Sequence, residues 1–190
     1  VDLVCAVLEA QACVETLAAA LAAAEGGAAR VELCVSLDVG GLTPPEELIR
    51  EAVRRLAIPV FVLVRPRPGS FVLRGTELTH LADQVRRAAD LGAAGIVAGA
   101  LTEDGAVDRV AVEALLPAAG PLPVTFHRAF DHIADQASAL EELIALGIRR
   151  VLTSGGAPTA VEGASRLRAL VDQAGGRIGI LAGGSVRAHN

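Results

Sequence analysis

The chain has 190 residues, of which 52% are apolar and 21% are charged, and its formal net charge is −5. This apolar content can build a large core, which excludes a disordered chain, and Arg or Glu interrupts every apolar run before the roughly 20 residues of a membrane span. Three cysteines are too few, and an odd number, for a disulfide framework, so we expect a reducing cytoplasm. The arginines are scattered, so we expect neither a nucleic-acid nor a membrane partner.

The basic residues are all arginine: the 17 Lys and Arg positions contain no lysine. A chain without lysine cannot form a Schiff base with a substrate, attach pyridoxal phosphate or build a Walker-type phosphate loop. Those chemistries are excluded.

Short β-branched runs recur along the chain, with starts roughly 27 to 36 residues apart, and each is too short for a helix and too apolar for a half-exposed strand. An early strand is expected over residues 8–13, and the later ones over 31–35, 60–64, 95–97, 124–126, 151–153 and 178–181. Segments with helical periodicity lie between them, including residues 14–25, 48–56, 78–89 and 140–146. The pattern predicts a βα unit repeated about seven times, with parallel strands.

The regular period favours a barrel over a doubly wound open sheet. The predicted fold class is therefore α/β, a TIM-type (β/α)₈ barrel that is incomplete, because such barrels usually need at least about 200 residues. We expect residues 1–190 to form one domain that lacks the last unit. Residues 186–190 read as the start of a helix without a cap, so we expect the natural protein to continue past Asn190; burial of the open edge in an oligomer ranks second.

Polar residues cluster where the predicted strands end, which is where barrels of this kind carry their chemistry. The candidates for binding an anion are Arg65, Arg67, Arg128, Thr153, Ser154, Gly155, Gly183 and Gly184. The candidates for acid–base catalysis are Glu32, His127 and Asp131. A carboxylate inside a barrel needs a cation, so we expect Arg65 to pair with Glu32. A purely structural ion pair and simple tight turns remain open as alternatives.

Six strings of the sequence resemble the CutC copper homeostasis family, in that family's order and across essentially the whole chain. They are residues 30–34 (RVELC), 40–44 (GGLTP), 65–67 (RPR), 125–131 (TFHRAFD), 150–155 (RVLTSG) and 182–184 (AGG). The resemblance implies a TIM-type barrel that is cytoplasmic, self-associates as a homo-oligomer and binds copper(I).

The resemblance also implies the metal ligands, which are a cysteine on the first strand and one that ends the second. These are Cys13 and Cys34; Cys13 is preferred to Cys5 because residues 13–16 (CVET) resemble the family's pattern and keep its spacing to Cys34. The sequence departs from the family at Gln11, where a glutamate is usual, and family members continue through a last strand and helix. Thiolates suit soft Cu(I), and we expect the two sulfur atoms to lie within reach of one metal ion.

Two functions therefore stay open. In the first, the chain handles copper and binds Cu(I) through Cys13 and Cys34. In the second, it is a barrel enzyme acting on a small anionic or phosphorylated substrate, which the arginines and glycine turns hold while Glu32 and His127 transfer protons. The sequence leaves open whether the chain is an enzyme.

Overall fold

The computed structural model describes residues 9–187, which form a sheet of seven parallel strands in the order β1 to β7. The strands are β1 (Gln11–Val14), β2 (Arg30–Leu33), β3 (Val60–Leu63), β4 (Gly95–Ala98), β5 (Val124–Phe126), β6 (Arg150–Thr153) and β7 (Gly179–Ala182). The α-helices are α1 (Leu17–Glu25), α2 (Glu46–Arg55), α3 (Glu77–Asp90), α4 (Arg109–Ala119), α5 (Gln136–Ala145) and α6 (Ala164–Ala174). Two short 3₁₀ helices, η1 (Leu37–Val39) and η2 (Arg128–His132), follow β2 and β5.

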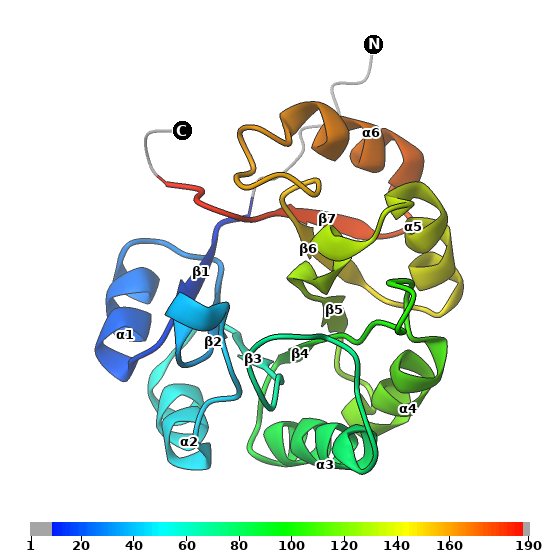
Figure 1. The fold of residues 1–190 in the computed structure, drawn as a ribbon. Coiled ribbons are helices and arrows are strands. Elements are labelled where there is room, and N and C mark those ends of the chain that lie inside the picture. Colours follow the sequence, from blue (N-terminus) through cyan, green and yellow to red (C-terminus); the bar gives the residue numbers. More distant parts are fainter. Residues whose placement is uncertain (1–8, 188–190) are drawn as a thin grey trace.

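The sheet curls into an incomplete TIM-type barrel, with the helices on its outer side (Figure 1). This confirms the predicted fold class and the βα repeat. Within residues 9–187, β1 and β7 are edge strands, each hydrogen-bonded to one neighbouring strand only. The ends of the elements differ slightly from the sequence prediction. The first helix begins at Leu17, because Val14 still belongs to β1 and the Thr16 hydroxyl caps the helix by accepting a hydrogen bond from the Ala19 N–H at 3.1 Å.

Alternation along the strands sorts the side chains into two layers. One layer packs between the sheet and the helices and contains the large core, with Phe126 and Phe130 among its fully buried side chains. The other lies inside the curled sheet and contains a smaller cluster of Cys34, Phe61, Leu63 and Val97. At the carboxyl ends of the strands, this inner layer faces the interior of the curled sheet.

The amino-terminal end of the inner layer is filled by an aromatic ring and two guanidinium groups. Arg150 and Arg30 lie 4.5 and 5.6 Å from the centre of the Phe61 ring, and Arg150 Nε donates a hydrogen bond to Thr125 Oγ1 at 3.1 Å. Gly95 leaves room for this packing, since a Cβ atom there would lie 2.4 Å from the ring. Burial is the main cause that lowers the pKa of Arg150 to about 10.

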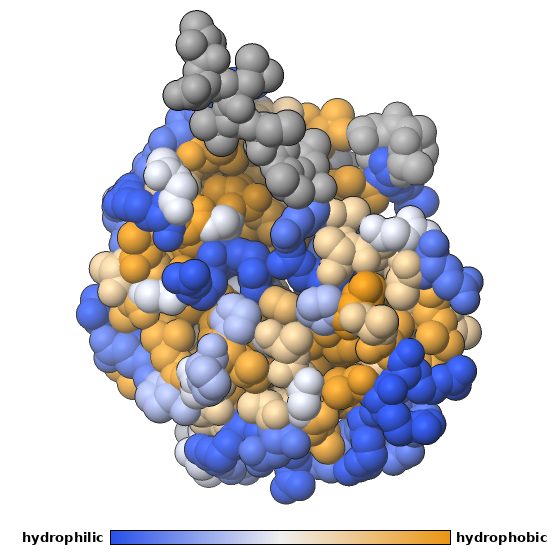
Figure 2. All heavy atoms as spheres, turned by 180° about the vertical axis from the view of Figure 1, so that it is seen from behind, coloured by the Kyte–Doolittle hydropathy of each residue, from blue (hydrophilic) through white to orange (hydrophobic). Residues whose placement is uncertain are grey.

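The outer surface carries the polar faces of the helices. Helix α2 is an example, with Glu46 and Glu47 in its first turn and Arg54 and Arg55 in its last, the arrangement that the helix dipole favours. Figure 2 shows hydrophilic and hydrophobic residues interspersed on one face, with many of the hydrophilic ones along its lower edge. Within the described part of the chain, none of the helices combines the length and apolar character that crossing a membrane requires.

Candidate functional site

A cavity of about 710 Å³ opens at the carboxyl ends of the strands. Its polar lining includes Cys13, Glu32, Arg65, His127 and Arg128, and its apolar walls come from side chains such as Leu63, Leu152 and Leu181. The structure thus gathers residues as far apart in the sequence as Cys13 and Leu181 around one space. Residues of both edge strands, β1 and β7, line the cavity as well.

The two candidate metal ligands lie side by side on β1 and just after β2. Their sulfur atoms are 3.5 Å apart, which confirms the predicted proximity. Cys34 is fully buried and its thiol lies 3.6 Å from the Val14 carbonyl oxygen, whereas Cys13 is exposed and lines the cavity. Although the residue is exposed to the cavity, the protein around its thiol partly excludes water; the hydrogen bond with Cys34, this desolvation and the nearby Glu32 carboxylate all raise the pKa of Cys13. Cys5, the third cysteine, lies outside the described residues.

Glu32 is buried, 3% exposed, beside the thiol pair. Its carboxylate accepts a hydrogen bond from Gln11 Nε2 at 2.7 Å, and the Cys13 thiol lies 3.8 Å from its other oxygen. Burial raises the pKa of Glu32 to about 7, although the hydrogen bonds from Cys13 and Gln11 oppose this. The sequence analysis noted Gln11 only as a departure from the family; its position two residues before Cys13 places it on the same side of β1.

The predicted pairing of Arg65 with Glu32 is wrong. Nη1 of Arg65 donates to the carbonyl oxygens of Val39 and Gly41 at 2.9 and 3.2 Å, and Nη2 donates to that of Gly69 at 3.0 Å. Its guanidinium lies 4.7 Å from the centre of the Phe71 ring. The reason is local: the loops that follow β2 and β3 bring carbonyl oxygens to the guanidinium, while Glu32 points to Gln11.

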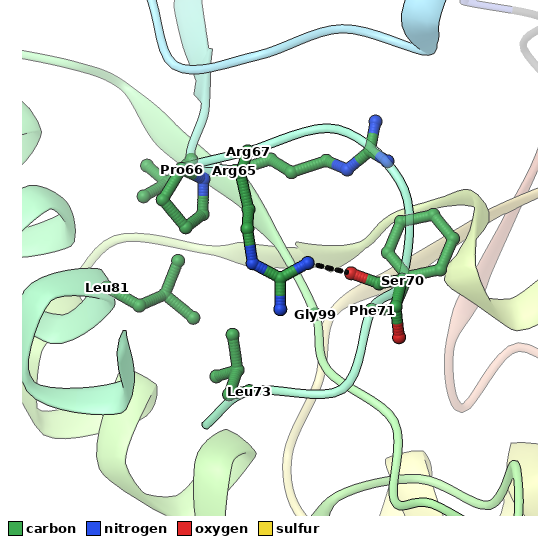
Figure 3. A pocket seen from close by; sticks show the side chains of 9 residues that line it. Arg65, Pro66, Arg67, Ser70, Phe71, Leu73, Leu81 and Gly99 are labelled. Carbon is green, nitrogen blue, oxygen red and sulfur yellow. Dashed lines mark hydrogen bonds between the residues drawn. The ribbon is translucent and has the colours of Figure 1, made fainter. Parts of the chain in front are cut away.

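Arg67 belongs to a different environment. It forms an ion pair with Glu77 and donates to the carbonyl oxygens of Ser70 and Val72 at 2.9 and 2.8 Å. Figure 3 shows this arginine beside a small pocket of about 10 Å³ under the loop after β3, with its hydrogen bond to Ser70 as a dashed line. Arg67 is not among the residues that line the large cavity. Its observed contacts hold the loop that carries Phe71, a residue that the sequence analysis missed because nothing in the sequence marks a loop phenylalanine.

His127 lies in the cavity wall as a neutral group. Burial, and next the positive charge of Arg65, lower the pKa of His127 to about 3. Its Nδ1 accepts a hydrogen bond from the Ala129 N–H at 3.3 Å, and its ring packs 5.0 Å from that of Phe71. A neutral imidazole at this position can accept or donate a hydrogen bond, but it holds no positive charge near pH 7.

The neutrality of His127 predicts a specific pH dependence of stability. In the unfolded chain the residue takes up a proton below about pH 6.5, whereas in the folded protein it does so only near pH 3. The contribution of neutral His127 to the free energy of unfolding is therefore fully present above pH 6.5 and falls by about 1.4 kcal/mol per pH unit below that pH. Glu32 acts in the opposite direction between pH 4.5 and about 7, since its folded-state pKa is raised. Because the two effects oppose each other, the free energy of unfolding of the wild type should change little over the pH range in which both act.

Chemical unfolding of wild type and His127→Gln across this pH range separates the two effects. The advantage of the wild type over the variant should shrink with each unit of acidification below pH 6.5. His80→Gln, at an exposed position of α3, is the matched control and should keep the wild-type profile. A constant difference between wild type and His127→Gln would show that His127 titrates alike in both states.

Asp131 fills the turn that was expected to hold an external anion. Its carboxylate accepts hydrogen bonds from the Thr153 hydroxyl at 2.5 Å, from the backbone N–H groups of Ser154 and Gly156 at 2.9 and 3.1 Å, and from Arg128 Nε at 2.8 Å. Burial alone would raise the pKa of Asp131, but these hydrogen bonds outweigh it and lower the pKa. Asp131, Thr153, Ser154 and Gly155 are not among the residues that line the cavity.

The turn after β7 and Arg128 do face the cavity. Arg128 Nη2 donates to the Ser154 hydroxyl at 2.9 Å, so Asp131 and Ser154 together fix the guanidinium. A Cβ atom at Gly184 would lie 3.4 Å from Arg128 Cζ, and its φ of +106° is one that other residues rarely adopt. Gly184 therefore lets the chain pass close to Arg128, whereas Gly183 makes room for Leu152, whose Cδ1 would lie 2.4 Å from a Cβ atom there.

The metal-binding potential of the site rests on the thiol pair. Among residues 9–187 there is no group of three or more His, Cys, Asp or Glu side chains that could hold a metal ion. Two thiolates are nonetheless a suitable donor set for Cu(I), the softest of the common biological metal ions.

Fold and site together define a class of protein: a parallel (β/α) barrel with a polar cavity at the carboxyl ends of its strands. The comparison with known proteins narrows this further. Residues 8–190 match the model of the CutC family, and the chain belongs to that family.

Relatives from bacteria and mammals agree with this assignment. The chain is 49% identical over 176 residues to a CutC family protein of Xanthomonas axonopodis pv. citri, covering 93% of the chain and 73% of the relative. It is 43% identical over 180 residues to the human copper homeostasis protein cutC homolog, covering 95% of the chain and 66% of the relative.

Solved structures show the same fold. The crystal structure of the copper homeostasis protein CutC from Streptococcus agalactiae matches with a TM-score of 0.91 and 38% identity, covering 96% of this chain and 90% of that one. A deoxyribose-phosphate aldolase from Coccidioides immitis matches with a TM-score of 0.66 at 16% identity, covering 94% and 72%, which shows likeness of fold alone.

Proposed function

We propose that this CutC family member acts in copper homeostasis by binding Cu(I) between the thiolates of Cys13 and Cys34. The separation of the two sulfur atoms, 3.5 Å, carries the proposal. Two metal–sulfur bonds of about 2.3 Å, the length of Zn–S bonds, span up to about 4.6 Å, so a small rotation of either side chain admits the ion. Cys13 is exposed to the cavity, which gives the ion a route to the buried Cys34.

Binding requires both thiols to lose their protons. Because the pKa of Cys13 is raised by its hydrogen bond with Cys34, by burial and by Glu32, the metal has to displace a proton that the site holds tightly. Affinity for Cu(I) should therefore rise with pH. The neutral form of Glu32 limits the negative charge beside the thiols.

Competition of the reduced protein with a chromophoric Cu(I) chelator tests the proposal. We expect one equivalent of Cu(I) per chain, and Cys13→Ser and Cys34→Ser should each weaken binding by more than about 100-fold, since even second-shell changes cost about 10- to 100-fold. Cys5→Ser keeps both proposed ligands and is the matched control. Unchanged affinity in both of the other serine variants would refute the proposal.

The setting of this function is also proposed: a single barrel domain that works in the cytoplasm and self-associates. Two reduced cysteines at 3.5 Å suit a reducing compartment, because close thiols oxidise readily elsewhere. Among residues 9–187, β1 and β7 each have a neighbouring strand on one side only, and a second copy can cover the backbone groups on the other side. Sedimentation equilibrium of the reduced protein tests self-association, and a monomer at all concentrations would contradict it.

A second candidate function, acid–base catalysis, is favoured by the position of Glu32. A cavity carboxyl group with a pKa of about 7 exchanges protons readily at neutral pH. Incubation of the metal-free protein in D₂O with a panel of 2-oxo acids, followed by proton NMR, would reveal exchange of hydrogens next to a carbonyl group. Glu32→Gln should abolish such exchange, and its absence across the panel would count against catalysis of this kind.

A further inference from the structure

Arg65 is a buried cation without an acidic partner among residues 9–187. The residue is 7% exposed, and the hydrogen bonds described for its guanidinium all go to backbone carbonyl oxygens. Its Nε is buried and has no hydrogen-bond partner in the described part of the chain. A buried guanidinium is costly unless an anion compensates it. Because Arg65 lines the 710 Å³ cavity, that anion can be a ligand.

Arg128 provides a second, preorganised cation in the same cavity. Asp131 and Ser154 hold its Nε and Nη2, while none of the hydrogen bonds described for residues 9–187 involves its Nη1. Its side chain is 44% exposed, so a ligand can reach it. A guanidinium held in place loses little conformational entropy when it binds an anion.

The contacts of the cavity indicate which kind of anion fits. The backbone N–H groups of Ser154 and Gly156, which would suit a phosphate group, already bind the Asp131 carboxylate. That internal anion also disfavours a doubly charged group nearby. What remains is Nη1 of Arg128, in a cavity that also carries the positive charge of Arg65, and this matches the smaller charge and fewer acceptor positions of a carboxylate.

We propose that the cavity binds a small organic acid, with its carboxylate at Arg128 and within the field of Arg65. The apolar side chains Leu63, Leu152 and Leu181 contact its carbon skeleton, and the neutral His127 offers a hydrogen bond. This site lies beside the thiol pair but does not depend on copper, so it goes beyond the function proposed above.

The test is thermal unfolding of the reduced, metal-free protein with propionate, butyrate, lactate or pyruvate, at ionic strength matched with sodium chloride. At least one acid should raise the melting temperature in a saturable manner. Isothermal titration should then show binding about tenfold or more weaker in Arg128→Gln, because a hydrogen bond to a charged group is worth at least that factor. Arg55→Gln removes the same charge from an exposed position of α2 and should bind like the wild type.

Further arms identify the ligand class and guard against misfolding. Arg128→Lys keeps the charge but cannot hold Asp131 and Ser154 together, so it should show an intermediate loss. Cys13→Ser should retain the acid, which separates this site from copper binding. Inorganic phosphate should stabilise the protein less than the best acid; stronger stabilisation by phosphate would overturn the carboxylate assignment. Absence of saturable stabilisation by every acid, or equal binding by Arg128→Gln, would overturn the site.

Discussion

Replacing Asp131 with alanine is expected to lower the free energy of unfolding by about 3–5 kcal/mol, the cost typical of removing one partner from a buried charged network. The side chain is 8% exposed and joins η2 to the turn after β6 through Thr153, Ser154 and Gly156. Without the carboxylate, these donors lose their acceptor and Arg128 loses its counter-ion. Chemical unfolding followed by circular dichroism measures the loss.

Two variants make this expectation specific. Asp131→Asn keeps the shape and one acceptor oxygen, and should therefore lose less stability than Asp131→Ala. Asp83→Ala removes an exposed carboxylate of α3 that pairs with Arg86, and should change stability by less than about 0.5 kcal/mol. Similar losses for Asp83→Ala and Asp131→Ala would contradict the structural role of the buried carboxylate.

Phe126→Ala should cost a further independent 3–5 kcal/mol, roughly the range for a fully buried phenylalanine. The side chain is fully buried in the core between the sheet and the helices, and its ring packs 5.9 Å from that of His127, which lines the cavity. Thermal and chemical unfolding measure the stability.

Val110→Ala is the matched control for this change. Val110 is 67% exposed on α4, so its truncation should change stability by less than about 0.5 kcal/mol. A loss below about 1 kcal/mol for Phe126→Ala would mean that the core collapses around the missing ring far more completely than cores usually do.

The fold could be predicted from the sequence because it rests on local patterns. Runs such as Val60–Leu63 are apolar at every position, as strands buried on both faces must be, and they recur at a regular spacing. Because side chains alternate along a strand, the sequence also predicts that Glu32 and Cys34 share one face of their strand, and that Thr125 and His127 share one face of theirs. The proximity of the two thiols followed from adjacent parallel strands in register.

The partners of the polar residues could not be predicted in the same way. The acceptors of Arg65 are carbonyl oxygens of two loops, and those loops are shaped by glycines with positive φ, such as Gly41 at +86° and Gly69 at +82°. Every residue offers a carbonyl oxygen, so sequence alone does not say which one a guanidinium will meet. Charge complementarity predicted Glu32 as the partner of Arg65, but the backbone of the two loops places carbonyl oxygens at the guanidinium instead.

The glycine turn after β6 illustrates a second limit. Its hydroxyl and N–H groups were expected to bind an external anion; in the structure they bind the chain's own Asp131, 22 residues before Thr153. An internal ligand and an external one leave the same signature in the sequence of the turn. Only the tertiary structure distinguishes them.

The stack of Arg30, Phe61 and Arg150 fills the amino-terminal end of the barrel interior. None of these three residues lines the cavity, which is therefore confined to the part of the interior nearer the carboxyl ends of the strands. A Cu(I) ion at the thiols and an organic acid at Arg128, both proposed above, would then occupy the same cavity. If binding of one changes the affinity for the other, thermodynamic linkage requires that both affinities change by the same factor.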